Sequence, residues 1–165
     1  MNQPIRKAII LLLLSLPFTV MALSTDKQQP VNIEADWVDV NKQKGTSIYK
    51  GRVIITQGSI RIDSDVATVY RNKNGIEKII ATGNPAKFRQ RPDNETEDIR
   101  GEGKRLEYFS SIDKLHLYEK AVLWQYKDVF TGDHINYDTR QHVVRATGKP
   151  GDSKERVRVT IQPTN

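Results

Sequence analysis

The stretch "SDVATVY", residues 64–70, contains one of four copies of a short pattern that decides the fold. Each copy begins with a small residue, usually followed by an acid, and continues with two apolar residues that one spacer separates. The other copies are "ADWVDV" (35–40), "GKRLEY" (103–108) and "GDHINY" (132–137). Their second positions lie 29, 39 and 29 residues apart. Repetition at this period predicts stacked supersecondary units that bury a shared apolar strip.

Around the copies, apolar and polar residues alternate at the period of a β-strand. The alternation is clear in "SIRID" (59–63), "KLHLYE" (114–119) and "RVRVTI" (156–161), and polar clusters such as "QRPDNETED" (90–98) separate the runs. Helical periodicity is nearly absent after the first residues. The pattern predicts an all-β chain of many short strands joined by turns.

The segments that follow the copies pair in alternation. "YKGRV" (49–53) matches "YEKAV" (118–122), and "ATGNP" (81–85) matches "ATGKP" (146–150). The chain is therefore predicted to consist of two halves, each with two strand-turn-strand units.

The apolar residues of each copy share strand parity, so all of them are predicted to face one interior. They are Val38, Val40, Ala67, Val69, Leu106, Tyr108, Ile135 and Tyr137. Upstream apolar residues have the opposite parity, which predicts a bulge or corner at Ala35-Asp36 and Ser64-Asp65, with structural aspartates that bond turn amides. Bent strands around a narrow interior predict a jelly roll or a flattened open β-roll.

The first 22 residues have the layout of a cleavable signal peptide, which leaves residues 23–165 as a single β-domain. Arg6 and Lys7 precede 13 apolar residues (8–20), and small or compact residues occupy 20–22. An apolar run of 13 residues is shorter than the roughly 20 that a membrane helix needs, although an uncleaved anchor is the alternative. The chain has no cysteine, so disulfides and a lipid-modified cysteine are excluded.

Composition favours a thin, elongated body. Only 37% of the residues are hydrophobic and 28% are charged, which is little apolar material for a compact domain of this size. Without the first 22 residues the net charge is +4, a mild basic bias that is compatible with anionic partners and identifies none.

Residues that carry chemistry are sparse. His116, His134 and His142 show no metal-site spacing, and no nucleophile motif or phosphate loop is present. Basic residues are interleaved with acidic ones rather than gathered in a patch, which disfavours nucleic-acid binding. We therefore expect no enzyme activity, no catalytic residues, no metal and no cofactor.

A binding role remains, because an interior strip that the opposite wall leaves uncovered is an apolar groove. Such a groove suits acyl chains, which gain about 0.8 kcal/mol per buried methylene. The alternative is that the same residues form an ordinary core. The terminal segments 29–36 and 156–163 are predicted edge strands that favour head-to-tail association of copies. A self-assembling β-filament or scaffold without a lipid ligand is therefore the second functional hypothesis.

The segment "VNIEADWVDVNKQKGTSIYKGRVIITQGSIRIDSDVATVYR" (31–71) resembles the first half of the LptA (OstA-like) family of lipopolysaccharide transport proteins. "GNPAKF" (83–88), "GEGKRLEY" (101–108) and "GDHINYD" (132–138) follow the pattern of its second half. One departure is Lys120-Ala121, where the family usually has Gly-Asn.

The resemblance implies a V-shaped open β-jelly roll in the periplasm that carries lipopolysaccharide through its lipid A acyl chains during outer-membrane assembly. It implies end-to-end stacking between an inner-membrane LptC-like component and an outer-membrane LptD-like component. At the rims, lipid phosphates are expected to meet Lys50, Arg52, Arg61 and Arg89, although surface solubility is an equally good explanation of these residues. The resemblance and the parity argument together yield the expected lipid-binding residues, which are Val31, Ile33, Val38, Tyr49, Val53, Ile55, Ile60, Ile62, Phe88, Leu106, Tyr108, Leu117, Val122 and Trp124.

Overall fold

The computed structural model describes residues 25–93, 95–151 and 156–163. The predicted signal peptide, residues 1–22, lies outside these ranges. The described elements are η1 (Thr25–Gln28), β1 (Val31–Glu34), β2 (Trp37–Asn41), β3 (Thr46–Gln57), β4 (Ile60–Asn72), β5 (Gly75–Gln90), β6 (Ile99–Phe109), β7 (Lys114–Gln125), β8 (Asp128–Asp138), β9 (Val143–Thr147) and β10 (Arg158–Thr160). The all-β prediction is confirmed. Within the described part of the chain, no helix has the length and apolar character that crossing a membrane requires.

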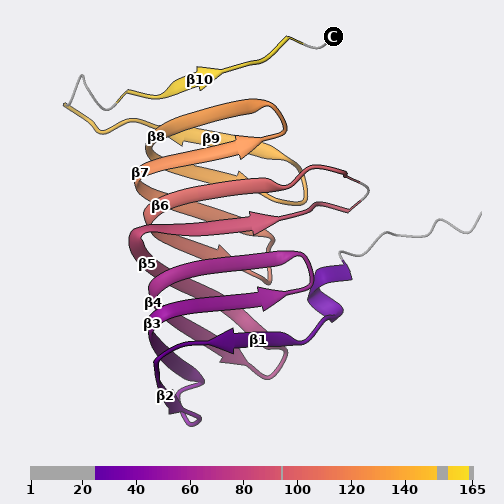
Figure 1. Ribbon diagram of the computed structural model, residues 1–165, viewed down its shortest axis with the longest axis vertical. Helices are drawn as coiled ribbons and strands as arrows, with labels where there is room; N and C mark the ends of the chain where they lie inside the picture. Colours follow the sequence, from indigo (N-terminus) through magenta and orange to yellow (C-terminus); the bar gives the residue numbers. More distant parts are fainter. Residues whose placement is uncertain (1–24, 94, 152–155, 164–165) are drawn as a thin grey trace, which may run out of the picture.

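The strands form one antiparallel sheet in the order β1-β3-β4-β5-β6-β7-β8-β10. β2 pairs with β3 beside β1, and β9 pairs with β8 beside β10. Figure 1 shows the resulting stack, which rises in sequence order from indigo β1 and β2 at one end to yellow β10 at the other. From β3 to β8 each strand pairs with its neighbours in sequence, as expected for repeated strand-turn-strand units.

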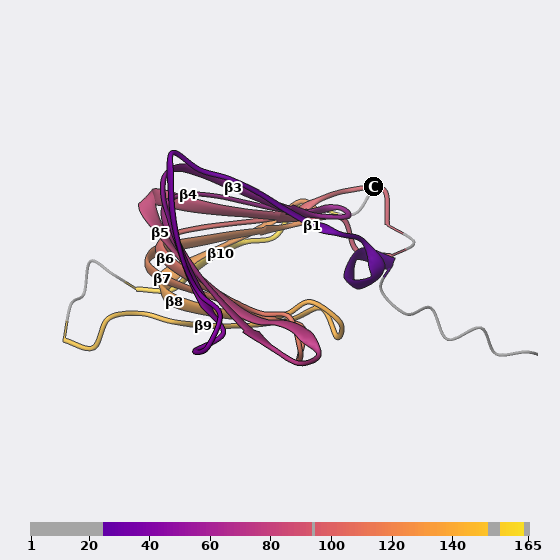
Figure 2. The same ribbon diagram turned by 90° about the horizontal axis from the view of Figure 1, so that it is seen from below.

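The long strands bend midway, so the sheet has the V-shaped cross-section seen in Figure 2. The pairing register shifts where they bend, between Lys50 and Val53 in β3 and between Asp63 and Val66 in β4, for example. Wall 1 is the arm made of β1, residues 53–57, 60–63, 86–90, 99–103, 121–125 and 128–132, and β10. Wall 2 is the arm made of β2, residues 46–50, 66–72, 75–82, 105–109, 114–118 and 134–138, and β9.

The predicted corners are present. The register shift in β4 spans Ser64 and Asp65. Asp36 lies between β1 and β2, where its backbone N–H approaches the carbonyls of Lys50 and Gly51 at 3.1 and 3.0 Å. Its carboxylate accepts a hydrogen bond from Arg52 Nε at 3.2 Å rather than from a turn amide, and this bond lowers the pKa of Asp36. Asp36 thus links the connection between β1 and β2 to the bend in β3.

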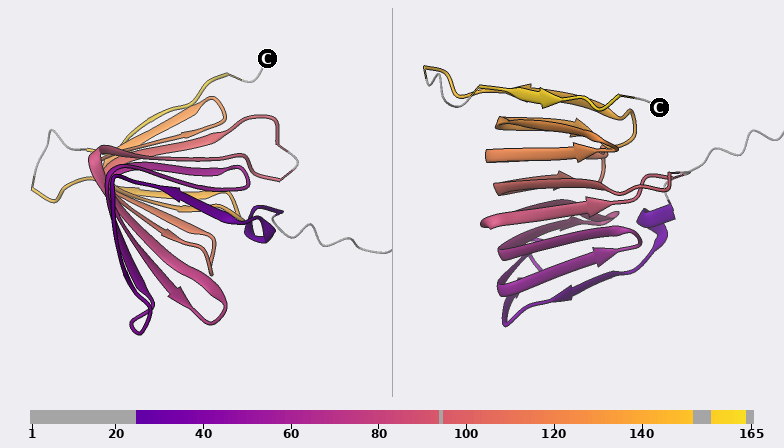
Figure 3. Two further views of the ribbon diagram at one scale, coloured as in Figure 1. Left: turned by 60° about the horizontal axis from the view of Figure 1, so that its bottom comes forward. Right: turned by 45° about the horizontal axis from the view of Figure 1, so that its top comes forward.

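The interior lies between the two walls. Six of the eight residues predicted to face it are buried in one hydrophobic cluster. Val38 and Val40 are the exceptions, since 52% and 44% of their surface is exposed. They belong to β2, which lies at the end of the stack (Figure 3) and is exposed along its whole length. Parity sets the direction of a side chain, but burial also requires a facing wall that covers it, so the predicted inward direction does not bury these two residues.

Candidate functional site

In the middle of the stack the two walls pack directly against each other. The ring centroid of Phe88 from wall 1 lies 5.4 Å from that of Tyr108 from wall 2. A Cβ atom added to Gly101 in wall 1 would lie 3.0 Å from a methyl carbon of Leu117 in wall 2. These side chains are almost fully buried. Burial raises the pKa of the Tyr108 hydroxyl well above its ordinary value. The middle of the interior is therefore a closed hydrocarbon seam.

At the β1 end the walls enclose a cavity of about 780 Å³. We call it the mouth cavity, and its lining residues are Lys27, Val31, Ile33, Tyr49, Gln57, Val69, Arg71, Asn72, Asn74, Gly75, Ile76, Glu77, Ser110 and Ser111. Its apolar members Val31, Ile33, Tyr49 and Ile76 also pack against the hydrophobic cluster. The cavity therefore continues the closed seam toward the end of the molecule, and its volume is within the range of small-molecule sites, about 300–1,000 Å³.

Most of the expected lipid-binding residues come together in this interior. Val53, Ile55, Ile60, Ile62, Phe88, Leu106, Tyr108 and Leu117 are buried in the seam, and Val31, Ile33 and Tyr49 line the mouth cavity. The expectation of an uncovered apolar strip holds at the mouth cavity, whereas the middle of the interior is packed. Contact of these residues with lipid stays a prediction.

Val122 and Trp124 were wrongly expected in the interior. In the wall 1 part of β7 (121–125) the buried residues are Ala121 and Leu123, which places their neighbours on the opposite, outer face. Trp124 packs there against Arg100, whose guanidinium carbon lies 5.6 Å from the indole ring. Val38 is also outside the seam, as described above.

The error in β7 has a structural cause at the corner. The similarity of "YEKAV" to "YKGRV" equates Val122 with Val53. However, the register shift falls between Tyr118 and Ala121 in β7, and between Lys50 and Val53 in β3. In the structure Ala121 is therefore the counterpart of Val53, one position earlier than the alignment of "YEKAV" with "YKGRV" suggests.

Both corners contain two residues with left-handed backbone, Gly51 (φ 80°) and Arg52 (φ 46°) in β3, and Glu119 (φ 58°) and Lys120 (φ 56°) in β7. Inserting two residues preserves parity, so the same face stays inward on both sides of the bend. Of the two corners, only the one in β3 contains a glycine, the residue type that adopts a left-handed backbone without steric cost.

Some residues of the interior were absent from the expected lipid-binding set. Val69 and Ile76 line the mouth cavity, and Ile79, Ala81, Leu115 and Leu123 are buried in the seam. The alternation of "GIEKIIA" (75–81) was a usable signal for Ile79 and Ala81, since both follow the parity of one strand face.

None of the basic residues expected at the rims lines the mouth cavity. Arg61 pairs with Asp63 on the outer face of wall 1, where Nε and Oδ2 are 2.9 Å apart, and Arg89 lies 3.6 Å from Asp98. Lys50 lies over the ring of Trp37 at 4.8 Å. The cations that do border the mouth cavity are Lys27 and Arg71.

The histidines form no recognisable metal centre. Among the described residues, no three His, Asp or Glu side chains are grouped as metal ligands. His116 Nδ1 lies 3.2 Å from His134 Nε2 on the outer face of wall 2, and the ring of His134 stacks on that of Tyr118 at 4.4 Å. Burial of its ring, followed by the charge of His134, lowers the pKa of His116.

A V-shaped antiparallel sheet that encloses a hydrocarbon seam and opens at one end defines the class of open β-jelly rolls. The family model described as "LptA/(LptD N-terminal domain) LPS transport protein" matches residues 32–143. The chain belongs to this family.

Individual relatives agree with this assignment. The lipopolysaccharide export system protein LptH of Pseudomonas aeruginosa is 32% identical over 148 residues, which cover 87% of this chain and 85% of LptH. LptA of Escherichia coli K12 is 31% identical over 92% of this chain and 81% of its own. The crystal structure of LptH, described as the LptA-homologous periplasmic component of a lipopolysaccharide transport device, superposes with a TM-score of 0.77 at 29% identity, covering 84% of this chain and 99% of LptH.

A shorter match reaches the LPS-assembly protein LptD of Vibrio cholerae, which is 41% identical over 58 residues, 34% of this chain and 7% of LptD. All these relatives are named as transport or assembly proteins for lipopolysaccharide. The hypothesis of a filament without a lipid ligand is not favoured by them.

Proposed function

We propose that this protein is a periplasmic carrier of lipopolysaccharide that shields the lipid A acyl chains and passes the lipid toward the outer membrane. The observation that supports the proposal most directly is the apolar seam between the walls, which continues into the mouth cavity of about 780 Å³. Acyl chains fit an apolar interior of this kind, while the sugars and phosphates of the lipid stay in water.

The energetics of acyl-chain burial favour such a carrier. Each methylene group that leaves water contributes about 0.8 kcal/mol. In the middle of the stack, acyl chains have to separate side chains such as Phe88 and Tyr108 and take over their contacts. The exchange replaces one hydrocarbon contact by another, so it carries no polar desolvation penalty. Lys27 and Arg71, at the mouth cavity, are placed to meet lipid phosphates.

The proposed function involves no chemical step. The lipid moves along the apolar surface, and no bond is made or broken. Directional transport then depends on an energy source in another component of the system.

The ends of the stack suit partners of the same fold. β1 and β2 form one edge and β9 and β10 the other, and an antiparallel sheet presents unpaired N–H and C=O groups at its edges. Val40 and Val159 are exposed there, at 44% and 47%. Pairing of the first edge of one copy with the last edge of another is heterologous and extends the stack. We propose head-to-tail self-association on this basis, and LptC-like and LptD-like components as partners at the two ends.

Lipid binding is tested by placing a photo-crosslinking amino acid at Tyr49, which lines the mouth cavity, and at Trp124, on the outer face. The protein is expressed with its signal sequence in a lipopolysaccharide-producing host, irradiated and analysed by mass spectrometry for hydroxylated acyl chains. The proposal expects strong crosslinks from position 49 and background from position 124. Equal labelling at both positions, or none at either, contradicts it.

Self-association is tested by light scattering over a range of protein concentrations. Val40→Glu and Val159→Glu place a charge on the two edges, so each should weaken association at least about tenfold, because a buried unpaired charge is strongly unfavourable. Ile112→Glu is the matched control, since Ile112 is similarly exposed at 54% but lies in the β6–β7 turn. A wild-type protein that stays monomeric at all concentrations overturns this part of the proposal.

A further inference from the structure

The short helix η1 lies at the open side of the V (Figure 2) and is bonded to the edge of wall 1 through Asp26. This aspartate is only 5% exposed. Its Oδ1 accepts a hydrogen bond from the backbone N–H of Ser59 at 2.6 Å, and its Oδ2 accepts bonds from Ser59 Oγ at 2.8 Å and Gln90 Nε2 at 3.2 Å. Ser59 is in the β3–β4 turn and Gln90 ends β5, so η1 is fixed to two neighbouring strand pairs.

The turn beside Asp26 is shaped for this contact. Gly58 has a left-handed backbone (φ 59°), and a Cβ atom added to it would lie 2.3 Å from Asp26 Oδ1. The side-chain amide of Gln57 donates to the carbonyls of Lys27 and Gln29 at 3.4 and 3.2 Å. The helix therefore belongs to wall 1 as a rigid attachment.

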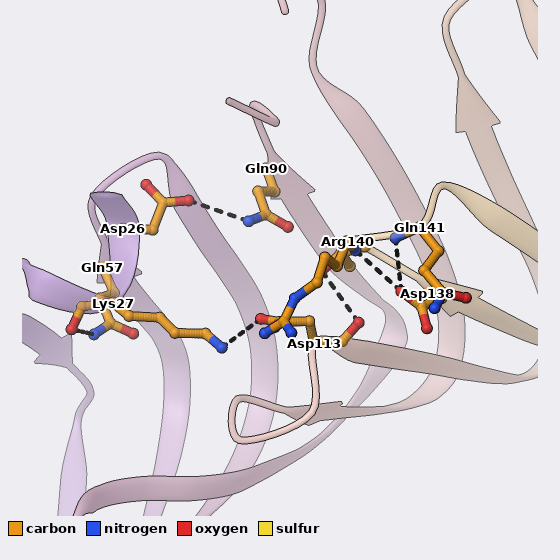
Figure 4. Close-up of polar contacts among 9 residues, drawn as sticks. Asp26, Lys27, Gln57, Gln90, Asp113, Asp138, Arg140 and Gln141 are labelled. Carbon is orange, nitrogen blue, oxygen red and sulfur yellow. Dashed lines mark hydrogen bonds and ion pairs between the residues drawn. The ribbon is translucent and has the colours of Figure 1, made fainter. Parts of the chain in front are cut away.

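One side chain of η1 reaches across to wall 2. Lys27 Nζ lies 2.6 Å from Asp113 Oδ1, in the β6–β7 turn (Figure 4). The other carboxylate oxygen of Asp113 accepts a bond from Arg140, in the β8–β9 turn, and the Asp113 carbonyl accepts one from the Thr139 N–H at 2.8 Å. With 8% of its side chain exposed, Asp113 is a fixed acceptor on the edge of wall 2.

The crossing lies over the proposed lipid path. Lys27 lines the mouth cavity. Burial, and after it the negative charges of Asp113 and Asp26, raise the pKa of the interior residue Tyr108. A lipid that enters through the side of the V at this point has to pass η1.

We propose that η1 is a clasp that holds the edges of the two walls together, and that opening of the Lys27–Asp113 ion pair admits lipid from the side. This inference rests on the proposed lipid-carrier function. Several hydrogen bonds attach the clasp to wall 1, whereas this ion pair joins it to wall 2, so the clasp opens at Lys27. An ammonium group forms charge-assisted hydrogen bonds with phosphate as well as with carboxylate. A phosphate of the lipid therefore competes with Asp113 for Lys27, and its arrival releases the clasp.

The test measures how fast the full mature chain captures fluorescent diphosphoryl lipid A. Lys27→Met keeps the length of the side chain without its charge, and Asp113→Asn keeps a residue type that tolerates the left-handed backbone at this position (φ 54°). Both variants are expected to capture lipid about three- to tenfold faster than wild type. The final occupancy of Asp113→Asn should equal that of wild type, because Asp113 does not line the mouth cavity. Lys127→Met, in the exposed β7–β8 turn, is the control with unchanged rate.

A covalent link between the two positions tests the closed state directly. Because the chain contains no cysteine, Lys27→Cys with Asp113→Cys can be joined selectively by a short bismaleimide. Linking should lower the rate of lipid capture at least about tenfold relative to the unlinked double variant, which should capture lipid fast. The same wild-type protein should capture lipid A that lacks phosphates more slowly, and this difference should vanish in Lys27→Met.

The outcomes separate the clasp from the carrier function. If wild-type protein captures no lipid A, the proposed function fails. If wild type captures lipid, but the variants, the control and the linked protein all do so at one rate, the clasp is overturned and the carrier function stands. If phosphate-free lipid A is captured at the same rate as the diphosphoryl form, phosphate is not the group that releases Lys27.

Discussion

The middle of the stack and its ends use the same strand alternation with opposite results. In the middle, each inward residue of wall 1 meets a residue of wall 2, and side chains such as Leu117 and Ile62 are fully buried. At the β2 end, Val38 also follows the inward pattern through its pairing with Tyr49, yet half of its surface is exposed. The difference is the presence of a facing wall.

This contrast explains how a protein with few apolar residues maintains both a core and a binding interior. The seam supplies stability, since its residues are buried against one another without lipid. The uncovered ends supply apolar surface that a second molecule can cover, and the mouth cavity lies where the seam meets one of these ends. Substitutions in the two regions should therefore affect different measurements.

Leu117→Ala should have the largest effect on stability. Leu117 is fully buried in wall 2, and truncation of such a leucine leaves a cavity in the seam. The free energy of unfolding should fall by about 2–5 kcal/mol, measured by urea denaturation. Val38→Ala, on the uncovered end, should change it by less than about 0.5 kcal/mol. Equal losses at the two positions would mean that β2 is covered in solution.

Gly101→Ala probes the same seam by adding volume. The new Cβ atom lies 3.0 Å from one methyl carbon of Leu117 and 3.2 Å from one of Leu115, so the walls have to separate or the leucines have to move. We expect a loss of about 1–3 kcal/mol in the free energy of unfolding. In the Leu117→Ala background the added methyl group has room, and its effect should shrink or change sign in a double-mutant cycle. An additive result would show that the two walls are not in contact here.

The sequence predicted the repeated architecture well because strand alternation and corner residues are local signals. The corner at Ser64-Asp65 and the inward direction of Tyr108 and Ile135 follow from parity alone. The outward direction of Val122 could not be predicted in this way, because it depends on whether the β7 corner inserts one residue or two. Nothing in "YEKAV" specifies the two left-handed residues that the structure shows there.

Long-range features of the site were beyond reach for a related reason. The exposure of Val38 depends on which strands lie opposite β2, and the position of Lys27 depends on a turn that is 86 positions further along the chain. Alternation describes one strand, whereas the mouth cavity and the clasp arise where separate strands and turns meet. The basic residues chosen for the rims failed for a different reason, since the outward parity of Arg61 and Arg89 in wall 1 is a local signal that the sequence carries.

The two equivalent corners offer a smaller test. Glu119 adopts a left-handed backbone that costs a residue with a side chain about 1–2 kcal/mol, whereas its β3 counterpart is Gly51. Glu119→Gly should raise the free energy of unfolding by about 0.5–1 kcal/mol, because the greater freedom of glycine in the unfolded chain offsets part of the relief. The exposed Lys104–Glu119 pair, 3.6 Å apart, contributes little.

Gly51→Ala is the reciprocal change and should lower the free energy of unfolding. A Cβ atom there would lie 2.4 Å from Asp36 Oδ2, so the new methyl group strains the backbone and displaces the carboxylate. If Glu119→Gly lowers stability instead, the two corners do not share one conformation in solution.

The smallest expected effect concerns His116, on the outer face of wall 2. Burial and the neighbouring His134 and Lys114 lower the pKa of His116, while Glu107 opposes them, so the folded state favours the neutral ring. As the pH falls through the ordinary value of 6.5, the unfolded chain takes up the proton first and the free energy of unfolding decreases. His116→Gln should flatten this decrease in urea unfolding between about pH 8 and about pH 5. At the alkaline limit His116 and its Gln replacement are both neutral, so the difference in the free energy of unfolding there reports packing alone. An identical pH slope in the variant would show that His116 protonates equally well in the folded sheet.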